Sequence, residues 1–196
     1  MSIFKAWVLR ANALRFTAGC QTLQLDRPRF ADLIKVQQSN LTSFGLIYDI
    51  RAQDDLAVRQ LILTGRLEPE AILDQQLNRL VPLEIQVLAL GYRQGQTTVV
   101  YGLPPQPPLS LDVLTVCTDS ELRSFSACLD YLPLILKASQ VPVDELVVAH
   151  LRRMAAVQPA EVRTQFLLEA GRRLAHWLYN DIPRLEAMLR RIRPTD

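Results

Sequence analysis

The sequence predicts an α+β protein in which an N-terminal antiparallel β-barrel with inserted helices precedes a C-terminal α-helical bundle. Two observations support this prediction. Residues 83–117 alternate apolar with polar side chains or run through β-branched and aromatic ones, as strands do. After Cys117 the apolar residues recur every three or four positions, as on one face of a helix. We therefore expect a β domain over residues 1–117 and a helical domain over residues 118–196.

The first part of the β domain is divided by turn-forming residues into several short apolar runs. Residues 3–9 and 14–25 are the first two candidate strands within residues 1–50, and Asn12 separates them. Arg10, Asn12 and Arg15 interrupt the apolar pattern of this region, so we do not interpret it as a leader sequence.

The end of the β domain contains a strand pair, a proline-rich link and a closing strand. The pair covers residues 83–90 and 97–101, with a glycine-containing turn over 91–96. The link, residues 104–108, has four prolines, which cannot donate a backbone hydrogen bond, so we expect it at an edge. Residues 111–117 form the closing strand.

A helical pair is expected at about residues 54–80, between strands of the barrel. Asp54 and Asp55 stand at a helix start, and Gly65 ends that helix. Pro69 suits the first turn of the second helix. This pair is the predicted insertion into the barrel.

The helical domain is expected to hold about four helices. Their ranges are 118–137, 143–154, 159–177 and 181–192, each with an apolar stripe at helical spacing. Pro133 lies inside the first range and should kink or split that helix. The short connections are typical of a small bundle.

Several motifs occur in an order that resembles HAS-barrel domains, which are shared by HerA-type DNA translocases and rotary ATP synthases. The matching segments are an entry strand, a second strand, a proline-rich link, a valine-rich strand and an acidic helix start: residues 30–36, 44–50, 104–108, 113–117 and 118–122. The resemblance covers roughly residues 5–125. It implies a barrel that docks partner proteins or neighbouring subunits while another domain performs the chemistry.

The chain departs from that family at two points. Ala31 stands where the entry strand usually has a glycine before its acidic residue. The sequence also contains no G-x-x-x-x-G-K-[ST] phosphate-binding loop. We therefore expect the barrel of a HerA relative without its ATPase motor, with the helical domain in the motor's place.

Composition indicates a globular protein without a strong charge bias. The net charge is +2, from 22 basic and 20 acidic residues, so bulk charge does not predict nucleic-acid binding. Cys20, Cys117 and Cys128 lack the spacing of a zinc site or a disulfide framework. No apolar run is long enough to span a bilayer. These features predict a cytoplasmic protein that has no membrane partner.

We expect no catalytic residue, cofactor or metal site in this chain. His150 lies near an apolar helical face and His176 beside arginines, which favours packing and surface roles over catalysis. A magnesium-dependent nuclease would need clustered carboxylates. The available set caps helices or faces outward more plausibly than it binds metal: Asp49, Asp54, Asp55, Glu70, Asp74 and Glu84.

Arginine pairs recur on the last three predicted helices and are the candidate partner-binding residues. Arginine suits bidentate pairing with carboxylate or phosphate. The set is Arg152, Arg153, Arg172, Arg173, Arg190 and Arg191. We expect a noncatalytic protein–protein interaction or assembly module with a protein partner, and a homo-oligomer stays open. A HerA-related DNA-repair accessory that contacts nucleic acid is the alternative, and a metal-dependent nuclease is the weaker one.

Overall fold

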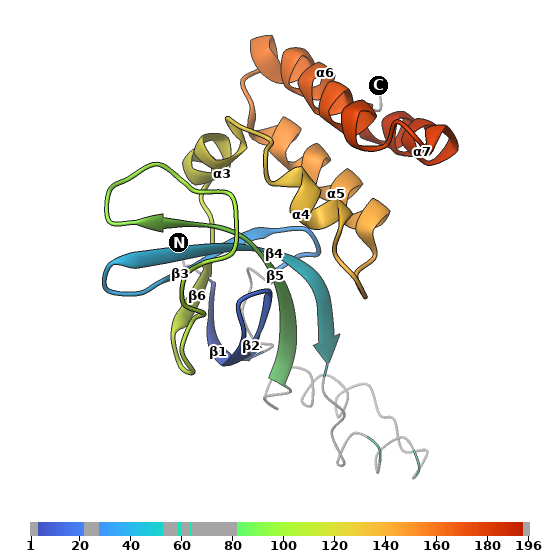
Figure 1. Cartoon of the computed structure of the whole chain (residues 1–196). Helices are drawn as coiled ribbons and strands as arrows, with labels where there is room; N and C mark the ends of the chain where they lie inside the picture. The colour runs from blue at the N-terminus through green and yellow to red at the C-terminus, as the bar shows by residue number, and fades with distance from the viewer. Residues whose placement is uncertain (1–3, 22–27, 53–58, 60–62, 64–81, 194–196) are drawn as a thin grey trace.

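A computed structural model describes residues 4–21, 28–52, 59, 63 and 82–193, and it contains a six-stranded antiparallel barrel followed by five helices (Figure 1). The strands are β1 (Lys5–Ala11), β2 (Arg15–Gln21), β3 (Leu33–Gln37), β4 (Leu41–Ala52), β5 (Pro82–Gln94) and β6 (Val113–Val116). Their order around the closed barrel is β1-β2-β5-β4-β3-β6. The α+β prediction is confirmed.

The barrel closes through pairing between its first and last strands. Trp7 of β1 lies opposite Val113 of β6, and β6 also pairs with β3. The longest ladder joins β4 to β5, with irregularities next to Phe44 and Ile47 that bend the strands as closure requires. Gly45 is needed at the first of these because a Cβ there would lie 2.4 Å from Val87 Cγ1.

The hairpin predicted after residue 90 differs from the observed one. β5 continues through the predicted turn to Gln94, because residues 91–94 pair with the start of β4. The strand predicted over 97–101 is reduced to one bridge between Tyr92 and Val100. Non-local pairing with β4 therefore overrides the turn signal of Gly91, whereas Gly95, with a φ of 57°, lies in the turn that follows β5.

The helices are α3 (Asp119–Ser126), α4 (Leu132–Leu136), α5 (Val143–Val157), α6 (Ala160–Trp177) and α7 (Ile182–Ile192). A capping box starts α3, in which Thr118 and Glu121 satisfy each other's backbone N–H groups. Five helices replace the four predicted because the first predicted helix is split. Pro133 occupies the first turn of α4, where its missing N–H costs little.

Two hydrophobic cores organise the molecule. Small and aliphatic side chains such as Ala6, Ile47 and Val87 fill the barrel interior. The second core lies between the helices and the outer faces of β3, β4 and β5, and includes Phe44 and Phe125, whose ring centroids are 5.4 Å apart. The bundle therefore covers one side of the barrel (Figure 1). β1 lies three positions from β4 around the ring, on the opposite side.

The predicted insertion lies almost wholly outside the described residues. Within 54–80 only Arg59 and Leu63 are described, and both are helical. The strand-to-helix change falls where the sequence places it, since β6 ends at Val116 and α3 begins at Asp119. In the described part of the chain, no helix is both long and apolar enough to cross a membrane.

Candidate interaction surfaces

The second arginine of each predicted pair connects its helix to another part of the fold. Arg173 of α6 lies 3.0 Å from Asp130 in the α3–α4 connection. Arg191 of α7 forms a two-pronged contact with Glu145 of α5. Arg153 of α5 lies 3.9 Å from Asp32, which precedes β3. These three side chains therefore join elements within the molecule. The remaining three are Arg152, Arg172 and Arg190.

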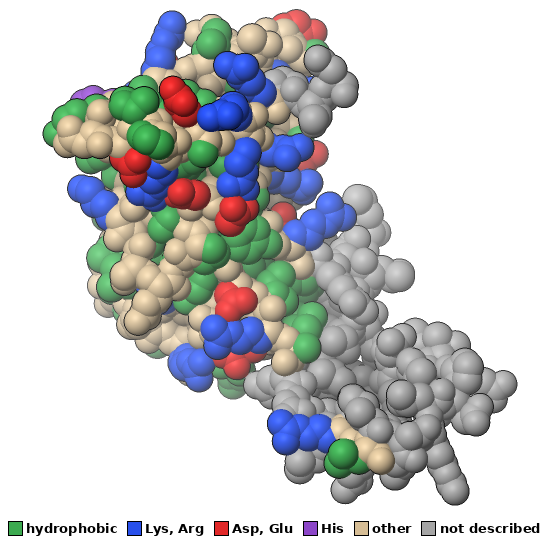
Figure 2. Space-filling view, turned by 90° about the vertical axis from the view of Figure 1, so that its right-hand side faces the viewer, with side chains coloured by type: hydrophobic (Ala, Val, Ile, Leu, Met, Phe, Trp, Pro, Cys, Tyr) green, Lys and Arg blue, Asp and Glu red, His purple; other side chains and the backbone are tan. Residues whose placement is uncertain are grey.

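The first arginine of each pair points to solvent. The Arg172 and Arg190 side chains are 70% and 73% exposed, and their nearest carboxylates, Glu169 and Glu186, lie on the same helices at 3.7 Å. Arg152 is exposed and has no ion pair with a described residue. On the side of the molecule that Figure 2 shows, basic and acidic side chains are interspersed over the helices. The six arginines thus do not act as one basic patch.

The pKa values of the ion-paired residues are set by their partners in two cases and by burial in the third. The hydrogen bond from Arg191 lowers the pKa of the Glu145 carboxyl, and Glu145 in turn raises the pKa of Arg191. Burial raises the pKa of the Asp32 carboxyl, although the Arg29 backbone and the nearby Arg153 charge oppose the shift. The Arg191–Glu145 and Arg173–Asp130 pairs lie on the surface, where solvent screens the attraction between the charges.

Of the six carboxylates considered for a metal site, two are described. Asp49 pairs with Arg51 at 2.6 Å, and Glu84 pairs with Arg10 at 2.8 Å. Asp54, Asp55, Glu70 and Asp74 lie outside the described residues. Within the described ranges, no group of three or more His, Cys, Asp or Glu residues could hold a metal ion.

The two histidines have the environments that a packing role and a surface role require. His150 is fully buried between the bundle and the barrel, and its Nε2 lies 2.9 Å from the Tyr131 hydroxyl. Burial lowers the pKa of His150 to about 4, and the Ala31 backbone opposes only part of this shift. His176 is exposed and packs edge-on against Trp177.

An apolar surface on the barrel was missed by sequence reasoning. It consists of Trp7 and Leu9 on β1, Val113 on β6 and Leu111 just before β6, and we call it the β1/β6 face. These side chains are between 40% and 74% exposed. Trp7 lies opposite Val113, and Leu111 N donates to Val8 O at 2.8 Å, which extends the ladder beyond β6.

The β1/β6 face is bordered by a glycine on β2 and by a charged pair beyond it. Gly19 of β2 lies opposite Trp7, and a Cβ at that position would lie 3.3 Å from Leu9 Cδ1. On the next strand Glu84 lies opposite Gly19 and pairs with Arg10. An apolar centre with a polar rim is the usual anatomy of a protein interface.

One sequence signal could have revealed this face. Ala6 and Val8 fill the barrel interior, while Trp7 and Leu9 between and after them are also apolar. A strand that is apolar on both sides is normally covered on both. The bundle covers β3, β4 and β5 instead, so the outer side of β1 is left to solvent.

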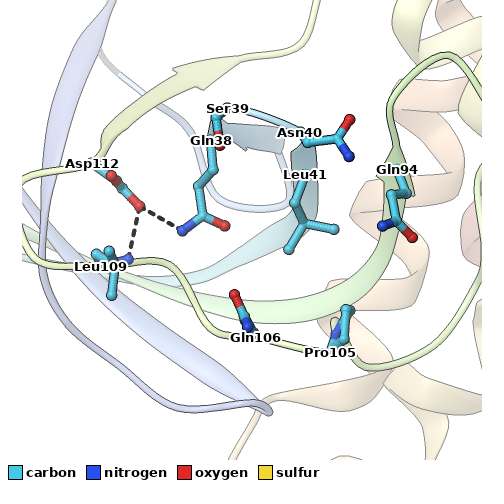
Figure 3. A pocket seen from close by; sticks show the side chains of 9 residues that line it. All are labelled: Gln38, Ser39, Asn40, Leu41, Gln94, Pro105, Gln106, Leu109 and Asp112. Carbon is cyan, nitrogen blue, oxygen red and sulfur yellow. Dashed lines mark hydrogen bonds between the residues drawn. The ribbon is translucent and has the colours of Figure 1, made fainter.

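A cavity of about 630 Å³ opens at one end of the barrel (Figure 3). The β3–β4 turn, the end of β5 and the proline-rich link form its walls. Four carboxamide side chains line it: Gln38, Asn40, Gln94 and Gln106. Gln38 and Gln106 reach toward one another from opposite walls.

Hydrogen bonds between the three segments hold the cavity walls together. The Asp112 carboxylate accepts from Gln38 Nε2 at 3.1 Å and from Leu109 N at 2.7 Å. Gly95 N donates to Asn40 O at 2.9 Å, which ties the end of β5 to the β3–β4 turn. The side chains of Asn40, Gln94 and Gln106 make no hydrogen bond to another described residue. The cavity therefore offers donors and acceptors but no unpaired charge.

The sequence matches no protein-family model and no functionally curated protein.

Proposed function

We propose that this chain is a noncatalytic protein-interaction or assembly module built on a HAS-type barrel, and that it docks a partner protein through the β1/β6 face. The carrying observation is that Trp7, Leu9, Leu111 and Val113 are exposed together on the side of the barrel opposite β4. Contiguous exposed apolar residues with a polar border mark protein-binding sites.

Barrel closure also favours side-chain docking over strand addition. At the β1/β6 face, β1 pairs with β2 and β6, and β6 pairs with β1 and β3, so neither strand offers an open edge to a partner there. A partner must therefore bind the side chains that the barrel displays. Tryptophan is the residue type most often found to dominate binding energy at interfaces, which makes Trp7 the expected anchor.

Three features support the HAS-type barrel within this proposal. The proline-rich link precedes β6, and the acid-capped start of α3 follows it within three residues. Ala31, at the position where the family usually has glycine, has a φ of 66°, a conformation that favours glycine. Along the chain Ala31 comes first and the link, β6 and α3 follow, which is the order found in HAS-barrel domains.

The nucleic-acid alternative would use the three outward arginines of the bundle. Arg152, Arg172 and Arg190 are exposed cations, but Glu169 and Glu186 lie beside two of them. Phosphate binding depends on uncompensated positive charge, so these carboxylates weaken this alternative. The four residues that define the β1/β6 face are apolar, which suits contact with a protein better than contact with a phosphate backbone.

The test compares partners captured from native lysate by the full-length wild type and by three variants. Trp7→Ser with Leu9→Ser removes the proposed anchor. Tyr179→Ser is the matched control, because Tyr179 is a 69% exposed aromatic residue on the bundle. Loss of an interface anchor costs about 2 kcal/mol or more, which is roughly a 30-fold weaker Kd. We expect specific partners to be lost from the double variant alone.

The third variant, Arg152→Glu with Arg172→Glu and Arg190→Glu, tests the alternative. If it loses nucleic acid or an acidic protein while the Trp7 variant retains every partner, the β1/β6 proposal is wrong. Circular dichroism must show that each variant is folded, and sedimentation of the purified wild type tells whether the partner is a second copy. A partner set that no variant changes also contradicts the proposal.

A further inference from the structure

We infer that the carboxamide cavity at the end of the barrel binds an uncharged, extended peptide segment, and that this segment belongs to the protein that docks on the β1/β6 face. The inference rests on the proposed function, because it describes a second contact with the same partner. Figure 3 shows the site from which it is argued.

The first step is the charge of the ligand. Asp112 is the charged residue among the side chains that line the cavity, and Gln38 and the Leu109 backbone already occupy its carboxylate. No arginine or lysine lines the described walls. An anion such as a phosphate would meet a negative wall without a cation. A neutral ligand therefore fits best.

The second step is the kind of hydrogen bonding on offer. Asn40, Gln94 and Gln106 each present an N–H₂ donor and a carbonyl acceptor, and these groups have no partner among the described residues. An extended polypeptide presents the complementary sequence of N–H and C=O groups along its backbone. No aromatic side chain lines the walls, so a nucleobase would find no stacking surface there.

The third step is size and shape. A volume of about 630 Å³ lies within the range of small-ligand sites, and suits a few residues of peptide. Leu41, Pro105 and Leu109 add apolar wall against which small side chains can pack. Because hydrogen bonds already hold the walls, little order has to be gained on binding.

The fourth step connects the cavity to the docking face. Leu109 and Asp112 line the cavity, while Leu111 between them belongs to the β1/β6 face. Ser110 Oγ lies 3.2 Å from Leu9 O, which fixes this short stretch against β1. A partner bound on the face is therefore adjacent to the cavity, and one of its extended segments can enter it.

The test uses a phage-displayed library of random dodecapeptides panned on the full-length chain. Enriched peptides are synthesised with blocked ends and their Kd is measured by fluorescence anisotropy. We expect uncharged peptides whose binding weakens at least about tenfold in Gln94→Glu with Gln106→Glu. That variant removes the amide donors and adds two negative charges facing the ligand. Gln165→Glu, an exposed glutamine on α6, is the matched control and should leave the Kd unchanged.

Amide NMR spectra of the wild type place the bound peptide independently of any variant. Saturable shifts are expected in residues 38–41, 94–95 and 105–109. The inference is overturned if no peptide is enriched, if the enriched peptides bind the double glutamine variant within about twofold of wild type, or if the shifts fall elsewhere.

The two proposals can fail separately. If lysate partners are lost from the Trp7→Ser, Leu9→Ser variant while no peptide depends on Gln94 and Gln106, the docking face stands and the cavity inference fails. If peptides depend on the glutamines but lysate partners ignore the Trp7 variant, the proposed function fails and the cavity remains a peptide site.

Discussion

The buried imidazole of His150 should make the protein sensitive to mild acid. Its ring has no solvent access, its Nε2 contacts the Tyr131 hydroxyl, and its Nδ1 has no hydrogen-bond partner among the described residues. A proton on this ring would be a buried charge that has no carboxylate partner and that the Ala31 backbone would stabilise only in part. The folded protein therefore holds His150 neutral, with a pKa lowered from 6.5 to about 4.

The sign and size of the effect follow from proton linkage. Between pH 6.5 and about 4 the unfolded chain binds a proton at His150 that the folded chain does not, so stability falls as pH falls. The full difference is about 3 kcal/mol, and about 2 kcal/mol of it should be lost between pH 7 and pH 5. That is a large fraction of the stability of an ordinary domain.

The assay is urea unfolding followed by circular dichroism at pH 7, 6 and 5. His150→Gln keeps a neutral hydrogen-bonding side chain, so its stability should fall by about 2 kcal/mol less over that interval than wild type. His176→Gln, which replaces the exposed histidine, should behave as wild type. Carboxyl titrations, including those of Asp32 and Glu121, are shared by all three proteins and cancel in the comparison.

A direct measurement covers the case in which His150→Gln does not fold. The ring proton shifts of wild-type His150 can be followed by NMR while the protein stays folded. A midpoint near 6.5 would show that the ring reaches solvent in the native state and would refute the reasoning. So would equal losses of stability in wild type and in the folded His150→Gln variant.

Three further outcomes are expected. Gly45→Ala should lower the free energy of unfolding by about 1–3 kcal/mol, because the new Cβ would clash with Val87 and a backbone oxygen. Gly102→Ala, which has open space around it, should change the free energy of unfolding in urea by less than about 0.5 kcal/mol. Equal values for the two variants would contradict the clash. Thr118→Ala removes the capping box of α3 and should cost about 1 kcal/mol in the same assay, and a neutral change would show that the cap is not needed. Burial raises the pKa of the Cys117 thiol, so Ellman's reagent at pH 8 should modify half-buried Cys128 first and Cys117 only on unfolding; early reaction of Cys117 would show that this part of the core opens.

The sequence by itself determined the features that depend on neighbouring residues. Apolar runs between turn-forming residues, together with the alternation that begins at Leu83, predicted the strands near β1, β2, β5 and β6, and the family resemblance predicted those near β3 and β4. The capping sequence at Thr118 placed the start of the helical region. Pro133 divided the first predicted helix, because a proline cannot donate the hydrogen bond that an uninterrupted helix requires there. The burial of His150 also followed from its place on an apolar helical stripe.

The tertiary structure alone decided which surfaces are exposed. The pairing of β1 with β6 joins residues that lie far apart in the chain, and the bundle packs on β3, β4 and β5. The local pattern of residues 5–9 is apolar on both sides of β1, so it indicates that both sides should be covered but not that the bundle leaves the outer side open. Trp7 is exposed because the helices pack on other strands of the barrel.

The arginine pairs show the same division at the scale of one helix. Arg172 and Arg173 look equivalent in the sequence, but adjacent residues on a helix point about 100° apart. One of the two can therefore reach across to Asp130 while the other faces solvent. Sequence spacing established that the pairs recur on successive helices. Helix rotation against the rest of the fold, set by the packing of the shared core, decided which member of each pair is free to meet a partner.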